Sequence, residues 1–409
     1  MTNVVVVLTD DGPRHDQDAH LSRAWRTLNG AARDFPYAWL STGLCNTARL
    51  SLFTGQYAKN HGVYVNNSLG TIDIDDAVWK WLSDAGVRNG LIGKETNIRN
   101  GSQAAPVGCD TLRRVTQANP DEWSFSYYDG TSLTTAVQEY QTEWMLDEAT
   151  TFLAGAEPFF LLLSPTLPHG LDWRSHHSDV GRFASLAFRP PDDPNIADKH
   201  SFWQALDALD GDALAAIRRQ YRRQMVEMKM VDRMVDGLLD VIDLSDTLLI
   251  VASDGGVSHG EHNRTGTLKN DLRRYSINVP FRMAGPGITP GTTTAPVNIE
   301  DISATLVAVF GATPSLTGDG IDLRDIIADP PTYDERFLLH QTRDDVNGVP
   351  DADGCSGRIS GTHYLYIEYV DGSGTIELFD NDGDPDHLVN ITDAGLRSTM
   401  AAELDTLLA

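Results

Sequence analysis

The sequence predicts an α/β fold: a large, mostly parallel central sheet flanked by helices, followed by a small C-terminal antiparallel sheet with a helix. Three observations lead to this prediction. Short apolar runs alternate with segments of helical periodicity. The runs are apolar throughout, as in parallel strands that are buried on both faces. After about residue 330, apolar and polar residues alternate instead, which is typical of antiparallel strands.

The chain has 409 residues, which is more than one growing hydrophobic core usually contains. We therefore expect a large domain over residues 1–330 and a smaller C-terminal α+β subdomain over residues 331–409. Hydrophobic residues make up 41% of the sequence, as in globular proteins.

The expected elements alternate along the chain. Strands are predicted at 3–8, 87–93, 158–164, 247–252 and 279–284. Helices are predicted at 18–33, 79–85, 139–153, 213–242 and 298–310. Residues 176–203 lack a clear period, so we expect a long surface loop there, lining a substrate cleft. The antiparallel strands are expected at 363–369 and 375–379.

The charge of the chain excludes some partners. The net charge is −26, and such a surface repels nucleic acid and anionic membranes. The sequence contains no run of about 20 apolar residues, which is the length needed to span a membrane. The start of the chain lacks a signal-peptide pattern, so we expect a cytoplasmic protein. The three cysteines, Cys45, Cys109 and Cys355, show no disulfide or metal-type spacing. The oligomeric state is not predicted.

Four of the predicted strands end in residues that could perform chemistry. These are Asp10 with Asp11, Lys94, His169 and Asp254. Because the carboxyl ends of parallel strands meet at one sheet edge, we expect one site there. Three converging carboxylates require a cation, and oxygen ligands favour Ca²⁺, or Mg²⁺, over Zn²⁺.

A cysteine is predicted to begin a helix near this site. Cys45 precedes a helical run, and Arg49 lies one turn later on the same face. The helix N-terminus favours a thiolate or an anionic ligand. The alternative is that Cys45 is a small core residue. With Lys94, Lys269 and His169, Arg49 would bind a tetrahedral anion, which indicates sulfuryl or phosphoryl transfer.

The chain resembles the type I sulfatases of the alkaline phosphatase superfamily. Their Cys-x-Pro-x-Arg signature corresponds to residues 45–49, and a Leu-Thr-Gly-like end to 53–55. The other motifs follow in family order: Asp10-Asp11, Gly93-Lys94, Pro168-His169, Ser253-Asp254, Gly260-Glu261-His262, and Lys269 ahead of Val279-Pro280. The stretch from Gly93 to Asn97 and the C-terminal Glu377-Leu378-Phe379-Asp380 are most similar to N-acetylglucosamine-6-sulfatase-like members.

This resemblance implies a mechanism. Cys45 would be oxidised by a formylglycine-generating enzyme, and the hydrated aldehyde would attack the sulfur of a sugar or small-metabolite sulfate ester. The metal ligands would be Asp10, Asp11, Asp254 and residue 45. Arg49 and Lys94 would orient the nucleophile, while His169 and Lys269 would bind sulfate and assist the leaving alcohol. His61 and Asn97 would lie near the site, and a structural role for His61 is the alternative.

Two positions depart from the family pattern. Thr47 replaces the proline by which the modifying enzyme recognises the segment, and Gly255 replaces an Asn or His metal ligand. Three hypotheses therefore remain open. The chain is a sulfatase, a phosphate or phosphonate monoester hydrolase on the same scaffold, or a degenerate member with an unmodified thiol and altered or no turnover.

Overall fold

The computed structural model describes most of the chain. The described residues are 2–12, 28, 30–97, 104–116, 123–169, 190, 193–206, 208–263, 269–343 and 348–409.

The described chain forms a ten-stranded sheet, a four-stranded sheet and a two-stranded ribbon of β12 with β3. The strands are β1 (Asn3–Thr9), β2 (Arg33–Asp34), β3 (Ala38–Trp39), β4 (Arg88–Gly93), β5 (Thr111–Val115), β6 (Ser124–Asp129), β7 (Ser132–Gln138), β8 (Phe159–Ser164), β9 (Thr247–Ser253), β10 (Phe281–Ala284), β11 (Gly291–Thr292), β12 (Val297–Asn298), β13 (Leu338–Thr342), β14 (Ala352–Ile359), β15 (Thr362–Tyr369) and β16 (Ile376–Asp380).

Helices connect these strands. They are α2 (Cys45–Thr54), α3 (Ala58–His61), α4 (Val78–Asp84), α5 (Gln141–Leu153), α7 (Ser201–Gln204), α8 (Gly211–Leu239), α9 (Arg274–Ile277), α10 (Glu300–Phe310), α11 (Leu323–Ala328), α12 (Pro330–Tyr333) and α13 (Ala394–Leu408), with 3₁₀ turns η2 (Ile196–Asp198) and η3 (Glu261–Asn263).

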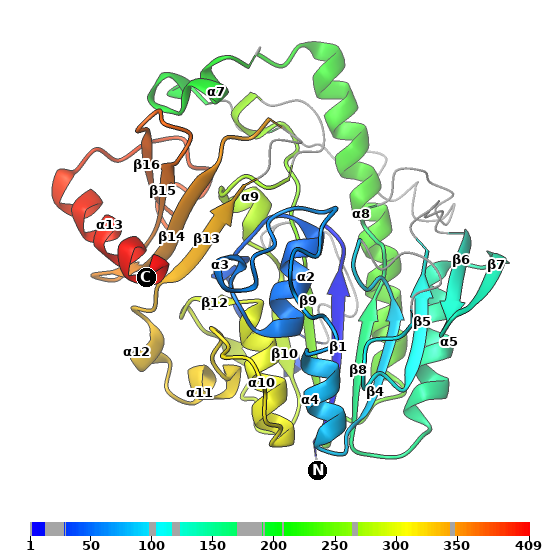
Figure 1. Ribbon diagram of the computed structural model, residues 1–409. Coiled ribbons are helices and arrows are strands. Elements are labelled where there is room, and N and C mark those ends of the chain that lie inside the picture. The colour runs from blue at the N-terminus through cyan, green and yellow to red at the C-terminus, as the bar shows by residue number, and fades with distance from the viewer. Residues whose placement is uncertain are drawn as a thin grey trace.

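The large sheet has the order β11-β2-β10-β9-β1-β8-β4-β5-β6-β7 (Figure 1). Its centre, β9-β1-β8-β4-β5, is parallel, whereas β10 and the β6–β7 hairpin run antiparallel to their neighbours. The sequence prediction of a mostly parallel sheet is confirmed. The four strands expected to share an edge are direct neighbours, so their carboxyl ends meet.

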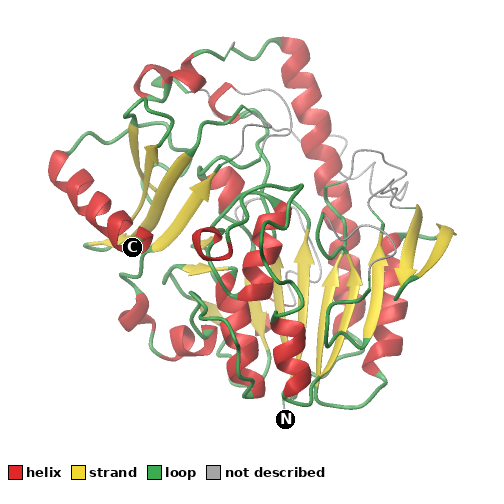
Figure 2. Ribbon diagram, viewed as in Figure 1, coloured by secondary structure: helices red, strands yellow, loops and turns green. Residues whose placement is uncertain are grey.

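Two helical layers cover the sheet (Figure 2). Along β1, Val4, Val6 and Leu8 pack on one face with side chains of α2, α4 and α10. Val5 and Val7 point to the other face, where they join apolar side chains of α5 and α8. This alternation of successive side chains explains why β1 is apolar throughout.

The four-stranded sheet β13-β14-β15-β16 is antiparallel, and α13 packs on it. We call these strands and α13 the small sheet. Its presence confirms the predicted C-terminal antiparallel sheet with a helix. The domain boundary at residue 330 stays a prediction.

Some expectations differ from the structure. Strands β5, β6 and β7 were not predicted, because polar residues outnumber apolar ones in them. On β5 and β6 the buried residues are Leu112, Arg114, Val115 and Phe125. The predicted surface loop over 176–203 lies partly outside the described residues, and its described end is not a surface loop. There, Lys199, His200 and Trp203 are buried. The predicted helix 18–33 lies mostly outside the described residues, and Arg33 belongs to β2.

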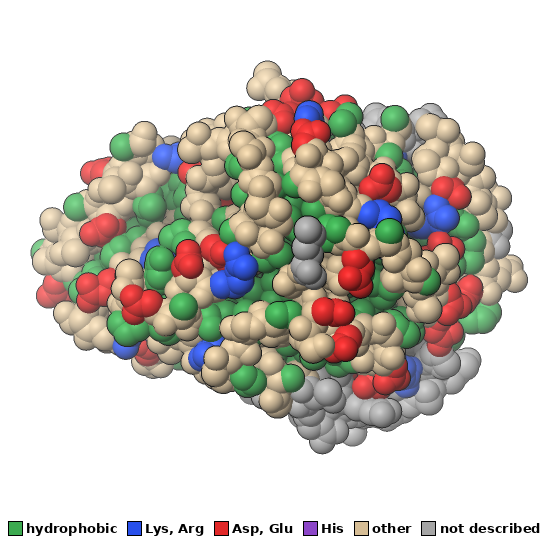
Figure 3. Space-filling view, turned by 90° about the horizontal axis from the view of Figure 1, so that it is seen from below, with side chains coloured by type: hydrophobic (Ala, Val, Ile, Leu, Met, Phe, Trp, Pro, Cys, Tyr) green, Lys and Arg blue, Asp and Glu red, His purple; other side chains and the backbone are tan. Residues whose placement is uncertain are grey.

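Among the described residues, no helix has the length and apolar character needed to cross a membrane. Seen from the end opposite the carboxyl ends of the parallel strands, the molecule shows acidic side chains spread over its surface (Figure 3). This distribution agrees with the net charge of −26.

Candidate active site

The exits of β1 and β9 place three buried carboxylates side by side. The backbone N–H of Asp11 donates to Asp254 Oδ1 at 3.1 Å. The Asp11 carbonyl accepts a hydrogen bond from Gln224 Nε2 of α8 at 2.8 Å. Asp11 has a left-handed backbone with φ 63°, a conformation that aspartate tolerates better than most residues. These two bonds hold the turn that presents Asp10 and Asp11.

Cys45 is the first residue of α2, as predicted, and its thiol lies against these carboxylates. The distance from Cys45 Sγ is 3.3 Å to Asp10 Oδ1 and 3.7 Å to Asp11 Oδ1. Lys269 Nζ donates to the same sulfur at 3.3 Å. The thiol is therefore at the centre of the predicted site, although it is only 1% exposed.

Each carboxylate has its own cation. Arg49 Nε pairs with Asp254 Oδ2 at 2.6 Å, and Lys94 Nζ with Asp10 Oδ2 at 2.7 Å. The third pair joins Lys269 to Asp11. We call these six charged residues and Cys45 the Cys45 cluster. Its formal charges balance in the absence of a metal ion, so a divalent cation would leave it positive and attractive to an anion.

Ion pairs offset the effect of burial at two members of this cluster. Burial acts to raise the pKa of Asp10, but Lys94, His169 and Arg49 outweigh it and hold that pKa below its usual range. Burial acts to lower the pKa of Lys269, but Asp11 reverses the effect and raises it. At Asp254 the balance is reversed, because burial outweighs the attraction of Arg49 and raises the pKa of that carboxyl.

The thiol behaves differently. Burial raises the pKa of Cys45 well above its usual value, and Asp254 raises it further, whereas Lys269 and Lys94 lower it. Among these side chains, burial therefore opposes the thiolate that a helix N-terminus favours. Loss of hydration outweighs the helix dipole, whose effect is usually at most about 2 kcal/mol.

Arg49 also reaches the ends of β4 and β8. Its Nη1 donates to Ser164 Oγ at 2.7 Å and to the Lys94 carbonyl at 2.8 Å. Its Nη2 is buried and has no hydrogen-bond partner among the described residues, so it can donate a hydrogen bond to an anionic ligand. Sequence reasoning did not select Ser164. Its position at the end of a predicted strand, at the same sheet edge, was the available signal.

His169 completes a possible metal site. One donor atom each from Asp10, Asp11, Cys45 and His169 lies within 4.8 Å of the others, in a search confined to the described residues. The side chain of His169 is 37% exposed, and its Nε2 lies 3.7 Å from Asp11 Oδ2. Asp254 is outside this donor group, because its oxygens accept from Arg49 and from the Asp11 N–H.

The departure at Gly255 lies directly beside the metal-type group. A Cβ atom placed on Gly255 would be 2.9 Å from Asp11 Oδ1. A side chain at this position would therefore project toward the carboxylates. Residue 255 has no side chain that could bind a metal. The nitrogen near Asp11 that could do so is Nε2 of His169.

His61 is not in the Cys45 cluster. Its Nδ1 accepts from the Val63 N–H at 3.2 Å, and its Nε2 lies 3.0 Å from Ser51 Oγ of α2. Ser51 Oγ is 3.4 Å from Ser41 Oγ, which donates to Glu300. We call His61, Ser51, Ser41 and Glu300 the support chain. These contacts favour the structural alternative for His61.

Two further positions complete the predicted set. Asn97 is half-buried and lies three residues beyond Lys94, and its place near the substrate stays a prediction. Thr47 is fully buried in the first turn of α2, where its Oγ1 has no hydrogen-bond partner among the described residues. The described part of the structure therefore shows no hydrogen bond that would explain why a threonine stands at position 47.

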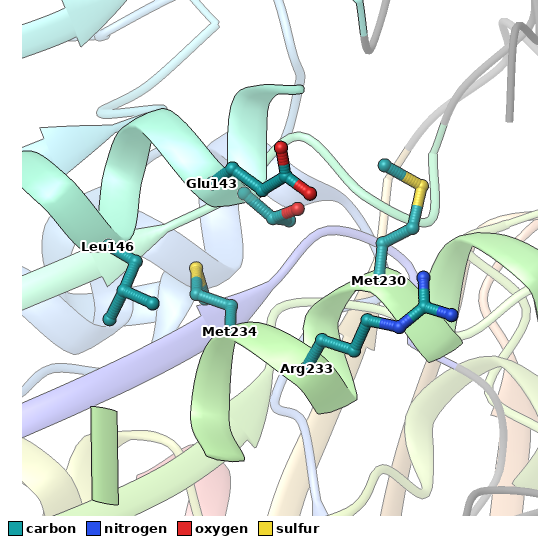
Figure 4. A pocket seen from close by; sticks show the side chains of 6 residues that line it. Glu143, Leu146, Met230, Arg233 and Met234 are labelled. Carbon is teal, nitrogen blue, oxygen red and sulfur yellow. The ribbon is translucent and has the colours of Figure 1, made fainter. Parts of the chain in front are cut away.

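A separate pocket lies between α5 and α8 on the sheet face covered by those helices (Figure 4). It is lined by Thr142, Glu143, Leu146, Met230, Arg233 and Met234. None of the predicted site residues contributes to it, so the chemistry of the Cys45 cluster does not extend there.

Comparisons with known proteins agree with this geometry. The Sulfatase family profile matches residues 2–312. Human N-acetylglucosamine-6-sulfatase is 23% identical over 461 aligned positions, which cover 95% of this chain and 80% of the relative. The extracellular sulfatase SULF-1 homologue of Drosophila melanogaster is 26% identical, over 70% of this chain and 28% of its own length. The chain spans only about a quarter to a half of the length of the extracellular sulfatase relatives.

Solved structures share the fold. A protein solved with its substrate D-glucosamine-2-N,6-O-disulfate superposes with a TM-score of 0.82 at 16% identity, covering 100% of this chain and 96% of that one. The phosphonate monoester hydrolase of Agrobacterium radiobacter gives a TM-score of 0.71 at 18% identity, covering 100% of this chain and 95% of that one.

Proposed function

This chain belongs to the sulfatase family, and we propose that it hydrolyses a sulfate ester of a saccharide through a formylglycine made from Cys45 on a bound divalent cation. The observation that carries the proposal is the position of Cys45 Sγ, 3.3 Å from both Asp10 Oδ1 and Lys269 Nζ. A reactive group at this position is held between a metal-type carboxylate and a cation that can bind the sulfate oxygens.

The donor set fits a hard divalent cation. Asp10 and Asp11 supply buried donors and His169 a half-exposed one, and the side chain at position 45 projects among them. Carboxylate oxygens favour Ca²⁺ or Mg²⁺, and we propose Ca²⁺. When present, the cation and the formylglycine supply an activated oxygen nucleophile and stabilise the negative charge that develops on the transferred group.

The residues of the chain divide the remaining work. Lys94 fixes the Asp10 carboxylate and Arg49 fixes Asp254, while Arg49 Nη2, which has no partner among the described residues, is left to donate to an anionic ligand. Lys269 Nζ donates to the Cys45 thiol, so it can bind a sulfate oxygen at this position. His169 is the most exposed of the predicted catalytic residues, so it is placed where a leaving alcohol can receive a proton.

A saccharide substrate is supported by the comparisons. A relative that aligns with 95% of this chain is named for 6-sulfated N-acetylglucosamine. A structural neighbour is bound to a disulfated glucosamine. Both proteins act on sulfate carried by an amino sugar, and we propose the same class of substrate for this chain.

The test begins with the Cys45 peptide. Protein co-expressed with a formylglycine-generating enzyme is digested and analysed by mass spectrometry, and Thr47→Pro is compared with wild type. Proline is tolerated in the first helical turn. We expect formylglycine in wild type, and a larger fraction in the proline variant. An intact thiol in both proteins would support the degenerate hypothesis instead.

Turnover is tested on a panel of sugar and aryl sulfates with Ca²⁺. We expect sulfate release that stops on chelation and returns when Ca²⁺ is added back. Cys45→Ala serves as the inactive control. Absence of sulfate release across the panel, from protein shown to contain formylglycine, contradicts the proposal.

A phosphonate or phosphate monoester hydrolase is the second candidate, because a phosphonate monoester hydrolase shares this fold. The cations of the Cys45 cluster can bind either anion. Turnover of matched sulfate, phosphate and phosphonate esters separates the two candidates, and we expect the sulfate ester to give the highest kcat/KM.

A further inference from the structure

One buried carboxylate joins the small sheet to two segments of the main body. Glu377 of β16 is fully buried. Its Oε1 accepts the backbone N–H of His200 at 2.7 Å, and its Oε2 pairs with Arg273. Glu377 therefore holds the 193–206 segment and the segment that begins at Lys269 in one place.

Arg273 receives this carboxylate in a closed environment. Its guanidinium is fully buried and lies 4.0 Å above the ring of Trp203. Its Nη1 donates to Asp271 Oδ1 at 3.1 Å, and Asp271 also accepts the Tyr275 hydroxyl. A fork that bridges two carboxylates fixes the arginine in one orientation. Asp271 is held with it.

Asp271 is two residues from Lys269. Between them, Asn270 has a left-handed backbone with φ 67° and packs on the turn before Cys45. A Cβ atom on Gly43 would come within 2.8 Å of the Asn270 backbone. The segment is therefore fixed by Glu377 through Arg273 at one end, and by contact with Gly43 next to the thiol at the other.

We propose that Glu377 is a positioning residue for the active site. It acts through Arg273 and Asp271 to hold Lys269 Nζ at Cys45. Through Glu377, the small sheet therefore helps to position a side chain of the active site. The inference relies on the proposed function for the role of Lys269, but the positional statement stands on the contacts alone. Displacing a catalytic group by about 1 Å can reduce the rate about 100-fold.

The first test removes both charges of the Glu377–Arg273 pair, while Asp271, the other partner of Arg273, keeps its hydrogen bond from the Tyr275 hydroxyl. In the double variant Glu377→Gln/Arg273→Met, both charges are gone, and such replacements of buried pairs are often tolerated. We expect normal folding, kcat lowered by 10- to 100-fold, and a crystal structure in which Lys269 Nζ has left Cys45. A variant with wild-type kcat and an unmoved Lys269 overturns the proposal.

The second test uses Arg273→Lys, which keeps the charge opposite Glu377 but cannot bridge Glu377 and Asp271 as a planar fork. We expect a smaller loss of kcat, of about 3- to 10-fold. Because this variant keeps a cation at the buried site, it provides the measurement even where the double variant folds poorly. No loss of kcat contradicts the proposal.

A mutant cycle separates positioning from general support. If Glu377 acts through Lys269, then Glu377→Gln adds no further loss of kcat in a Lys269→Ala background. Losses that multiply indicate a merely structural role and overturn the proposal. Asp353→Asn is the matched control, because Asp353 pairs with Arg343 in the same sheet. It is expected to lower the Tm and to leave kcat unchanged.

These outcomes also separate this inference from the proposed function. The position of Lys269 in the variant crystals does not depend on turnover. A wild type that releases no sulfate, together with a displaced Lys269 in the double variant, contradicts the proposed function and supports the positioning role.

Discussion

Polar groups are buried on two sides of α2, but they are stabilised there in different ways. On the side of Cys45, the cluster pairs each buried carboxylate with a cation. On the side of Ser51, the support chain keeps its groups neutral. Burial raises the pKa of Glu300 to about 8 and lowers that of His61 to about 4. Both sides are buried to a similar degree.

This difference shows what burial alone does not decide. Paired charges remain where the proposed cation and substrate anion would use them, and each pair costs desolvation that the partner must offset. Neutral groups remain where the only task is to hold α2 against α3 and α10. The same helix therefore has a reactive side and a supporting side, and substitutions should separate them.

The largest expected effect is on activity at the reactive side. Cys45→Ala removes the proposed nucleophile and should lower kcat by about 10⁴-fold or more. Ser51→Ala, on the same helix but facing the support chain, should stay within about tenfold of wild type. Both are measured by sulfate release. Equal losses would remove the distinction between the two sides.

The next effect is on stability. Asp254→Asn leaves the fully buried Arg49 without its charged partner, so we expect a loss of about 3–5 kcal/mol in the free energy of unfolding. Urea denaturation measures this loss. The double variant Asp254→Asn/Arg49→Met should recover much of it. A single variant as stable as wild type would mean that the pair is not ionised.

A smaller effect concerns pH on the supporting side. Because the pKa of Glu300 is about 8 in the folded protein and about 4.5 unfolded, only the unfolded state loses this proton as pH rises from 4.5. Its contribution to stability is therefore full below pH 4.5 and is lost through pH 8. Glu300→Gln should remove this loss, and gain roughly 3 kcal/mol relative to wild type between pH 5 and 8.

Urea denaturation of both proteins at each pH provides that measurement, and the difference between them cancels the titration of other groups. Parallel pH profiles for wild type and Glu300→Gln would show that Glu300 is ionised when folded.

The smallest effect is expected at His61, at the other end of the support chain. Burial lowers its pKa from 6.5 to about 4. Protonation of the unfolded state therefore costs stability as pH falls from 6.5 toward 4. His61→Asn should remove roughly 2 kcal/mol of this loss at pH 4.5. Thermal unfolding at pH 7 and pH 4.5 measures it, and an unchanged difference between the two pH values contradicts the neutral support chain.

The sequence predicted the reactive side better than the supporting side. Asp10, Lys94, His169 and Asp254 each follow an apolar strand, so topology alone brings them together. His61 could not be assigned in the same way, because its neighbour Ser51 is separated from it by a helix end and a turn. Hydroxyl contacts of this kind leave no periodic signal.

The small sheet shows the same limit. Two of its strands were predicted, at 363–369 and 375–379, whereas β13 and β14 were not. Glu377 appears in the sequence only as one inward position of β16. The partners that give it a role, Arg273 and His200, lie more than 100 residues away. Pairings over such distances depend on packing of whole elements, and a single sequence does not show them.

The acidic surface has a consequence for encounter rates. An anionic ester approaching a chain of net charge −26 meets long-range repulsion before it reaches the cations of the Cys45 cluster. Added salt shortens the range of that repulsion to about 8 Å at physiological ionic strength, while the buried cations of the site are screened much less. The association rate constant for the substrate should therefore be higher in concentrated salt solution than in dilute buffer.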